Sequence, residues 1–384
     1  MKKHLVIAWE MGEGFGHVLP MTQIGQYFRD KGWHVSFITK DIYALSKALG
    51  DASFPVYPAP QLIPGKPRYP QVQGFAHTLS DSGFLDPQVL APALHAWRHL
   101  FTLLNPCLLM LDYAPTALVA ACQLNMPCGL IGSGFCIPPN VETLPSYQGE
   151  TLPSLKDAEA HIVAAINQQL DLYQRSPIHS VGEFHAQADF QALLTTPELD
   201  HYPDRPAATY LGPLLHSTGR QCQWRTSKKK VLAYLKYGYP HLPKLLSVLT
   251  HQPYEIIVAI PDAPGSLRQR PSSPNLQLFT ELVDIEPLLQ GADAFIHHGG
   301  HSSIHWASRY TVPSLVFPLN REQWMGAKRV EEQRRGVICP NLPALPALLR
   351  QAINLSFLIQ EQNHQQQPLE WLFNAATQHA TKKN

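Results

Sequence analysis

Apolar and polar residues follow two alternating patterns along the chain. Short apolar runs, such as 4–9 and 35–39, stop at a polar residue, which is typical of buried strands. Between them, Met21, Ile24 and Phe28 recur at intervals of three and four residues, which predicts a helix. A strand, a helix and a second strand in this order form a βαβ unit, so the pattern predicts a parallel sheet.

The same pattern continues and then starts again in the second half of the chain. In the first half we expect a strand at 108–111, a helix at 115–125 and a strand at 128–131. In the second half the expected strands are 231–235, 255–260, 276–279, 294–297 and 314–317. The expected helices between them are 240–251, 286–291, 302–309 and 323–335. The fold class is therefore α/β, with two Rossmann-like doubly wound parallel sheets whose ligands bind in a cleft at the carboxyl ends of the strands.

The predicted organisation has three parts. They are an N-terminal domain over 1–215, a C-terminal domain over 216–355, and a C-terminal helix over 356–384 that packs back on the N-terminal domain. We expect the connection between the domains in the segment 195–230, which is rich in proline, threonine and serine. In the less regular segment 140–205, amphipathic helices are expected at 156–172 and 183–194.

Composition narrows the class of protein. Of 384 residues, 45% are apolar and 15% are charged, which favours a globular protein. The formal net charge is +1, so nucleic acid is not expected as a partner. No apolar run is long enough to cross a membrane and the N-terminal run is too short for a signal peptide, so we expect a cytoplasmic protein. The six cysteines form no CxxC pair and are expected to be reduced, buried thiols.

Glycines and a histidine follow the first predicted strand. Gly12, Gly14 and Gly16 let the backbone turn tightly, and His17 stands at the start of the next helix. The helix dipole disfavours the imidazolium form there, so His17 is a candidate general base. A structural or merely exposed histidine is the alternative.

A carboxylate at the end of another strand could assist that base. Asp112 ends the apolar run 108–111 and opens the following turn. With His17 it would form a dyad in which the carboxylate orients the ring and stabilises its protonated form. Asp112 could instead, or in addition, cap the helix at 115–125.

The segment FIHHGGHSS at 295–303 takes a strand through two glycines into a helix that begins with hydroxyl residues. Amides at such a helix start form a phosphate site. Four histidines, His297, His298, His301 and His305, leave a metal site as a rival interpretation, since His301 and His305 are four residues apart on a helix. A third interpretation is a tight turn in which the histidines are incidental.

Taken together, these motifs resemble those of the GT-B fold glycosyltransferases that use nucleotide sugars, such as macrolide and plant natural-product glucosyltransferases. The matching motifs are GHVLP at 16–20, Asp112 in LDYAPTA at 111–117, HGGHSS at 298–303, Val-Pro at 312–313, and PLNREQ at 318–323.

The resemblance implies an acceptor-binding N-terminal domain and a C-terminal domain that binds a nucleotide diphosphate-sugar, with UDP the expected nucleotide. It implies inverting transfer to a hydroxyl of a small-molecule or lipid-like acceptor, with His17 as base and Asp112 as its partner. No strict DxD motif is present, so neither a metal nor a cofactor is expected. The implied donor-binding residues are Gly14, Gly16, Lys236, His298, Gly299, Gly300, His301, Ser302, Ser303, Glu322 and Gln323.

Two departures from the family pattern keep other functions open. Trp306 stands where the family often has an acidic residue that holds the donor ribose, and Gly326 stands where asparagine is common. A sugar-nucleotide epimerase of the same fold, or a degenerate nucleotide-sugar binding protein, is the alternative. Transfer further requires that His17 and the turn at 298–303 confront each other across a shared cleft.

Residues of 60–90 and 130–190 are expected to contact the acceptor. The aromatic residues that hint at a flat or apolar molecule are Tyr69, Phe75, Phe84, Trp97, Phe135 and Tyr147, although packing explains them equally well.

Overall fold

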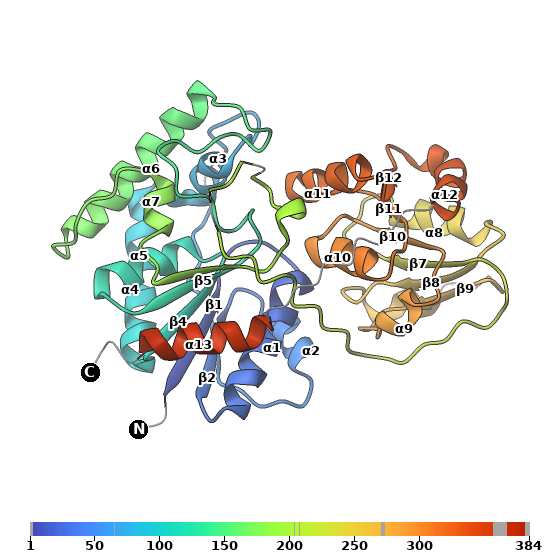
Figure 1. Ribbon diagram of the computed structural model, residues 1–384, viewed down its shortest axis with the longest axis horizontal. Coiled ribbons are helices and arrows are strands. Elements are labelled where there is room, and N and C mark those ends of the chain that lie inside the picture. The colour runs from blue at the N-terminus through green and yellow to red at the C-terminus, as the bar shows by residue number, and fades with distance from the viewer. Residues whose placement is uncertain are drawn as a thin grey trace. The chain divides into compact units, whose positions relative to one another are not determined.

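The computed structural model describes residues 3–64, 66–202, 204–206, 208–269, 273–355 and 367–380 (Figure 1). The chain divides into two compact units. The first unit consists of Met1–Leu214 and His364–Asn384, and the second of Leu215–Asn363.

The first unit is built on a parallel sheet of six strands. In chain order these are β1 (His4–Trp9), β2 (His34–Thr39), β3 (Val56–Pro58), β4 (Leu108–Asp112), β5 (Cys128–Gly132) and β6 (Phe190–Leu193). Their order across the sheet is β3-β2-β1-β4-β5-β6. The chain runs outward from β1 to β3 and then returns to the other side of β1. The carboxyl ends of β1 and β4 therefore flank a topological switch point, where ligands of such sheets bind.

Helices cover both faces of this sheet, so its central strands are buried throughout. The helices are α1 (Phe15–Asp30), α2 (Ile42–Leu49), α3 (Phe75–Leu79), α4 (Pro87–Leu104), α5 (Pro115–Leu124), α6 (Pro153–Asp171) and α7 (Val181–His185), with a π-helical segment Ser80–Phe84 and a 3-10 turn Pro197–Leu199. Such all-parallel sheets need cover on two sides, which explains the continuous apolar runs of β1 and β4.

The C-terminal helix α13 (Pro368–Ala380) belongs to the first unit. Leu372 and Ala376 are fully buried in the core that α1 forms against the sheet. The ring of Phe373 lies 5.2 Å from that of Phe28 on α1. Burial of a side chain such as Leu372 contributes about 1.5–3 kcal/mol to folding, so α13 is an integral part of the N-terminal core.

The second unit repeats the architecture. Its strands are β7 (Lys230–Tyr234), β8 (Glu255–Ala259), β9 (Leu276–Phe279), β10 (Ala294–His297), β11 (Ser314–Val316) and β12 (Gly336–Ile338), in the order β12-β11-β10-β7-β8-β9. Its helices are α8 (Leu242–Thr250), α9 (Glu286–Leu289), α10 (His301–Arg309), α11 (Arg321–Glu332) and α12 (Leu345–Ile353), with 3-10 turns at Gly265–Gln269 and Leu342–Ala344. The switch point of this sheet lies between β7 and β10.

The prediction of two doubly wound parallel sheets is confirmed. The helix expected at 183–194 is wrong: α7 ends at His185, and β6 follows at Phe190–Leu193. Phe190 and Ala192 are buried against β5 and α13, and a short apolar run of this kind does not distinguish strand from helix. The first part of the tail expected at 355–380 lies outside the described residues, and the helix begins at Pro368.

Three strands and a long helix were not predicted. β3 and β12 have three residues each and β6 four, so a periodic pattern has no length in which to develop. Helix α4 contains Pro92 and begins with Pro87, and prolines are ordinarily read as breaks. Among the described residues, no helix is long and apolar enough to cross a membrane.

Candidate active site

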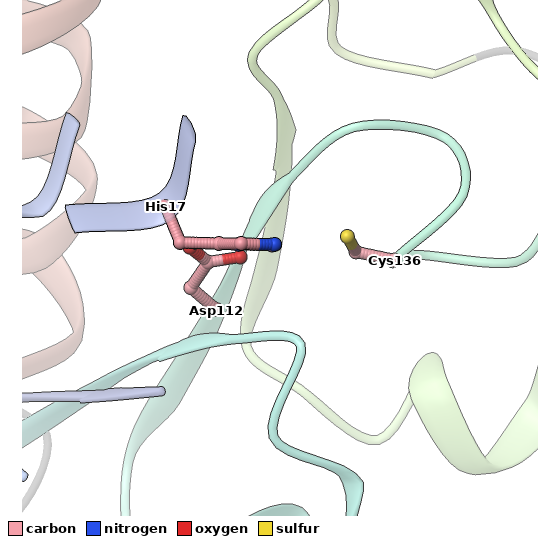
Figure 2. Close-up of side chains that lie close together, drawn as sticks. All are labelled: His17, Asp112 and Cys136. Atoms are coloured by element: carbon pink, nitrogen blue, oxygen red, sulfur yellow. The ribbon is translucent and has the colours of Figure 1, made fainter. Parts of the chain in front are cut away.

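The switch point of the first sheet brings His17 and Asp112 together (Figure 2). Trp9 at the end of β1 pairs with Asp112 at the end of β4, and His17 lies in the first turn of the helix that follows β1. Nδ1 of His17 lies 2.9 Å from Oδ2 of Asp112. Because a carboxylate only accepts, Nδ1 carries the proton and donates it, and the lone pair of the neutral ring is on Nε2.

Close packing fixes the plane of the imidazole. The ring of Trp9 stacks on it at 5.1 Å, with 20° between the planes, and the ring of Tyr113 stacks at 6.3 Å. Gly12 has φ +81°, and a Cβ built on it would lie 2.5 Å from Nε2 of His17. Gly12 is therefore required both for the turn and for the room that the imidazole occupies.

The backbone beside Asp112 is strained. Tyr113 is not a glycine, yet its φ is +44°. Its carbonyl accepts a 3.0 Å hydrogen bond from the backbone N–H of Met11, which ties the turn after β4 to the loop after β1. Strained residues of this kind persist where the surroundings hold them, and they concentrate at functional sites. Asp112 is buried, and its Oδ1 has no hydrogen-bond partner among the described residues.

The cap of α5 comes from a residue that the sequence interpretation did not single out. Oε2 of Glu10 accepts hydrogen bonds from the backbone N–H groups of Thr116, at 3.0 Å, and Ala117, at 3.3 Å. Asp112, the expected candidate for this cap, makes no cap hydrogen bond to α5. Burial raises the pKa of Glu10 to about 7, although the hydrogen bonds from the helix act in the opposite direction.

Cys136 also lies at this site, in the loop after β5. Figure 2 shows the nitrogen at the tip of the His17 ring pointing toward its sulfur. One potential ligand atom each from His17, Asp112 and Cys136 lie within 4.8 Å of one another, and no other such group of three occurs in the described part of the chain. The sequence marked Cys136 only as a buried thiol, because nothing local relates it to His17.

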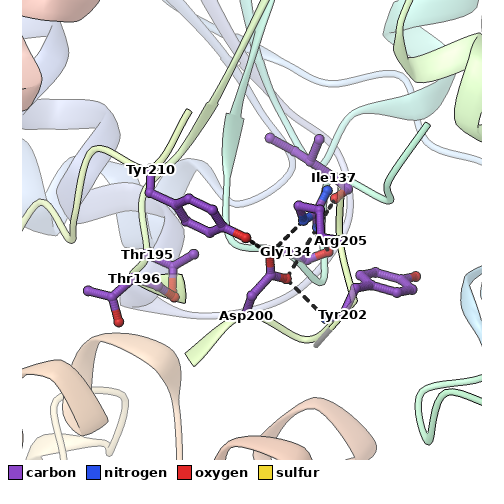
Figure 3. Close-up of polar contacts among 8 residues, drawn as sticks. All are labelled: Gly134, Ile137, Thr195, Thr196, Asp200, Tyr202, Arg205 and Tyr210. Atoms are coloured by element: carbon purple, nitrogen blue, oxygen red, sulfur yellow. Dashed lines mark hydrogen bonds and ion pairs between the residues drawn. The ribbon is translucent and has the colours of Figure 1, made fainter. Parts of the chain in front are cut away.

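A buried ion pair holds the loop that carries Cys136 (Figure 3). Nη2 of Arg205 donates to the carbonyls of Gly134, at 3.3 Å, and Ile137, at 2.7 Å, on either side of the cysteine. Nε of Arg205 lies 2.5 Å from Oδ2 of Asp200, which also accepts from the hydroxyl of Tyr210 at 2.6 Å. Burial opposes ionisation of Asp200, but Arg205 and Tyr210 outweigh it, so the pKa of this carboxyl is lowered.

In the second unit, His297 shapes the turn that follows β10. It is fully buried; Nδ1 accepts the backbone N–H of Gly299 at 2.9 Å, and Nε2 donates to the hydroxyl of Ser314 at 3.0 Å. Burial lowers the pKa of His297 to about 3, so the ring is neutral. Both nitrogens are engaged within the protein, so His297 has a structural role.

His298 occupies the switch point itself. Its Nδ1 donates to the backbone carbonyl of Phe317 at 2.8 Å, while Nε2 is buried and has no partner among the described residues. Burial lowers the pKa of His298, and the charge of Lys236, after β7, acts in the same direction. The structure thus brings two of the predicted donor-binding residues into one neighbourhood.

The glycines after His298 lead directly into α10. Gly299 has φ +84°, and a Cβ there would lie 2.8 Å from the carbonyl oxygen of Gln323, so this turn approaches α11 too closely for a side chain. Gly300 is the N-cap of α10, which starts at His301. The first N–H groups of a helix have no carbonyl partner within the helix, and such helix starts favour anions.

The four histidines of this region do not converge. His301 and His305 contact each other, with their Nε2 atoms 3.1 Å apart, whereas His297 and His298 are bound to β11 and to the carbonyl of Phe317. Among the described residues no third ligand joins the His301–His305 pair in a group of three. The geometry therefore favours the anion interpretation of this turn over the metal interpretation.

Comparison with known proteins agrees with this architecture. Residues 243–376 match the family described as Erythromycin biosynthesis protein CIII-like, C-terminal domain. The chain has the fold of CalG4, the calicheamicin glycosyltransferase, with a TM-score of 0.66 at 17% identity over 99% of this chain and 97% of that one. The chain has the GT-B fold, and its second unit resembles the nucleotide-sugar glycosyltransferases.

Further glycosyltransferases match over most of the chain. The UDP-glucosyltransferase YdhE of Bacillus subtilis (strain 168), itself uncharacterised, is 20% identical over 357 residues, which are 88% of this chain and 87% of that protein. The spinosyn rhamnosyltransferase SpnG has a TM-score of 0.65 at 15% identity in its complex with thymidine diphosphate, over 99% of this chain and 95% of that one. SpnG has also been solved with the spinosyn aglycone.

Packing explains both departures from the glycosyltransferase pattern. Trp306 is 4% exposed and stacks on Tyr310 within the apolar cluster on one face of the second sheet. A Cβ at Gly326 would lie 2.6 Å from Cδ1 of Ile304, so the glycine allows α11 to pack on α10. Both residues therefore alter the packing of α10, Trp306 from within that helix and Gly326 from α11.

Glu322 and Gln323, the pair at the start of α11, have two different environments. Gln323 is 6% exposed, and its side-chain oxygen accepts the backbone N–H of Leu319 at 2.8 Å. Its amide oxygen therefore holds the loop before α11. Glu322, in the first turn of α11, is more exposed and better placed to meet a ligand.

Proposed function

We propose that this protein is a glycosyltransferase that moves a sugar from a nucleotide diphosphate-sugar to a hydroxyl of a small, largely apolar acceptor, with inversion at the anomeric carbon. In this proposal the first unit binds the acceptor and the second unit binds the donor. The observation that carries the proposal is the 2.9 Å pair of His17 and Asp112 at the switch point of the first sheet.

The chemistry assigned to this pair is general base catalysis. Nε2 of His17 takes the proton of the acceptor hydroxyl as its oxygen bonds to the anomeric carbon. The bond from that carbon to the diphosphate breaks, and the electron pair leaves with the nucleotide. Asp112 stabilises the imidazolium that forms, and general base catalysis of this kind contributes about 10²–10⁴-fold to the rate.

The start of α10 is the assigned site for the diphosphate. The amides of His301, Ser302 and Ser303 and the positive end of the helix dipole favour an anion there. Lys236 adds a positive charge in the neighbourhood of His298. These groups would stabilise the charge that develops on the leaving diphosphate, so the proposal needs no divalent metal.

UDP and thymidine diphosphate are the two candidate nucleotides of the donor. YdhE is named as a UDP-glucosyltransferase, and SpnG was solved with thymidine diphosphate. Uracil and thymine share the same hydrogen-bonding edge, so hydrogen bonds to the base do not distinguish the two nucleotides. Competition between UDP and thymidine diphosphate for binding to the protein will show which one is preferred.

Aromatic side chains next to the dyad support an apolar acceptor. The ring of Tyr113 lies 6.0 Å from that of Phe135, which stacks on Tyr147 at 5.0 Å. Phe75 lies 6.2 Å from Tyr113. Phe75 and two of the other aromatic residues expected to contact the acceptor, Phe84 and Trp97, are fully buried and serve the core.

The test is replacement of the base. His17→Ala is expected to lower kcat about 10²–10⁴-fold, while thermal stability and the affinity for nucleotide diphosphate stay near those of the unchanged protein. His161→Ala is the matched control, because His161 lies 3.6 Å from Asp157 in an exposed His–Asp pair on α6 and should not affect turnover.

The product identifies the reaction class. Mass spectrometry should find a glycosylated acceptor and free nucleotide diphosphate in equal amounts. A donor that isomerises in the absence of acceptor would instead indicate an epimerase. Turnover by His17→Ala at the rate of the unchanged protein would refute the assignment of His17 as the general base.

A further inference from the structure

We propose that His17, Asp112 and Cys136 form a binding site for a thiophilic divalent cation of the Zn²⁺ class, and that occupation of this site blocks transfer. The binding site rests on geometry alone. The inhibition rests on the proposed function, because it requires His17 to be the base.

The three side chains supply ligands that such a cation prefers. A thiolate and an imidazole nitrogen select Zn²⁺ and its heavier relatives, and a carboxylate oxygen is a regular third ligand. Around a tetrahedral Zn²⁺, with bonds of about 2.0–2.3 Å, ligand atoms stand about 3.3–3.6 Å apart. The three ligand atoms already lie within 4.8 Å of one another. To reach tetrahedral spacing around a cation on Nε2 of His17, the carboxylate of Asp112 gives up its hydrogen bond from Nδ1 and turns toward the cation.

An unpaired acceptor and an open space add to the ligand set. Oδ1 of Asp112 is buried and has no hydrogen-bond partner among the described residues, and a buried carboxylate oxygen without a partner is costly. Gly132, with φ +144°, lies beside it; a Cβ there would be 3.2 Å from Oδ1 of Asp112 and 3.2 Å from Cβ of Cys136. The glycine therefore leaves room between two of the three ligands.

The Arg205–Asp200 pair holds the cysteine in place. Arg205 binds the carbonyls of Gly134 and Ile137, and its side chain is only 4% exposed. A loop held on both sides of the ligand keeps the thiol near His17 before the cation arrives. Partners of this kind orient metal ligands, and their loss reduces affinity about 10–100-fold.

Binding exchanges a proton for a metal bond. The Cys136 thiol releases its proton to solvent as the sulfur–metal bond forms, and no electron is transferred. The lone pair on Nε2 of His17 becomes a metal ligand and no longer accepts a proton from the acceptor. Transfer should therefore stop while the affinity for nucleotide diphosphate in the second unit is kept.

The binding test uses Cd²⁺, whose thiolate complexes have a charge-transfer band in the ultraviolet. The full chain should develop this band with one Cd²⁺ per molecule, and Zn²⁺ should displace it. Cys136→Ser should lose the band, whereas Cys107→Ser, which changes another thiol of the first unit, should keep it. Cys136→Ala should lose the band as well, and a melting curve for each variant distinguishes loss of the thiolate ligand from misfolding.

Two further variants show that the site is the one proposed. His17→Ala should need at least tenfold more Cd²⁺ for the same band, since one ligand is lost. His305→Ala should leave the band unchanged, which separates this site from the His301–His305 pair. A band that survives in Cys136→Ser, or that depends on Cys107, would overturn the proposal.

Inhibition of sugar transfer is measured in a separate experiment. The rate of each protein with Zn²⁺ is compared with its own rate in the presence of a chelator. Zn²⁺ should abolish transfer by the unchanged protein, and the chelator should restore it. Transfer by Cys136→Ser should resist inhibition by Zn²⁺. If no sugar is transferred under any condition, the proposed function fails while the Cd²⁺ band still tests the site. A bound metal with undiminished transfer would overturn the inhibition.

Discussion

Two histidines occupy comparable places in the two units, and their partners differ. His17 follows the first strand of its sheet and pairs through Nδ1 with the carboxylate of Asp112. His298 follows β10 at the switch point of the second sheet and pairs through Nδ1 with the carbonyl of Phe317. Each hydrogen bond fixes the tautomer and presents Nε2 to the site.

The difference in partner separates the two assigned tasks. A carboxylate stabilises the imidazolium form, so His17 is suited to take a proton. A carbonyl carries no charge, and burial lowers the pKa of His298, so that ring stays neutral. Position at a switch point therefore does not make a histidine a base. The group that accepts the hydrogen bond from its Nδ1 decides whether it can act as one.

The largest expected effect comes from removing that carboxylate. Asp112→Asn keeps the shape of the dyad but allows the wrong tautomer of His17, and we expect kcat to fall by about 10³–10⁴-fold. Steady-state kinetics measure the change, with Asp157→Asn on the surface of α6 as the control. A loss of less than tenfold would mean that the two histidines are more alike than their partners indicate.

The next effect tests the altered core of the second unit. Trp306→Glu introduces the acidic residue common in the family at a position that is 4% exposed. Loss of the buried indole should destabilise the protein by about 3–5 kcal/mol, measured by denaturant unfolding. Tighter donor binding by a folded Trp306→Glu protein would instead show that the ribose contact can be restored.

Two buried titratable groups, Glu10 in the first unit and His297 in the second, should contribute opposite pH dependences of stability. The pKa of Glu10 is raised to about 7 in the folded first unit, so the folded state binds the extra proton between pH 4.5 and 7. The contribution of Glu10 to stability is thus largest at low pH and falls by about 3 kcal/mol as pH rises through this window, whereas His185 of the same unit, whose pKa burial lowers to about 4, acts in the opposite direction. Glu10→Gln should flatten this part of the stability profile.

His297 in the second unit should contribute the reverse dependence. Its pKa is lowered to about 3, so the unfolded state binds the extra proton below pH 6.5 and stability falls as the pH drops toward 3. Chemical denaturation followed by hydrogen exchange in each unit would separate the two slopes. A first-unit stability profile that Glu10→Gln leaves unchanged would contradict the assignment to Glu10.

The smallest effect concerns the contact between α10 and α11. Gly326→Ala places a methyl group 2.6 Å from the end of Ile304, and overpacking of this kind destabilises by about 1–3 kcal/mol. Gly238→Ala in the same unit meets nothing within 4 Å and is the control. Equal melting temperatures for the two variants would show that α11 yields without strain.

The sequence by itself determined the α/β class, the central strands of both sheets and the loops that carry His17 and the turn at 298–303. These features are local: strand and helix periods, and glycines at sharp turns, are readable along the chain. It did not determine the short strands β3, β6 and β12, since three or four residues carry no period.

Only the tertiary structure decided the contacts between segments distant in sequence. It assigned the cap of α5 to Glu10, brought Cys136 beside His17, and showed that His297 serves the core. Each of these pairs is joined by packing and hydrogen bonds across the fold. A thiol, a carboxylate or an imidazole has the same letter in every surrounding, and its surroundings decide what it does.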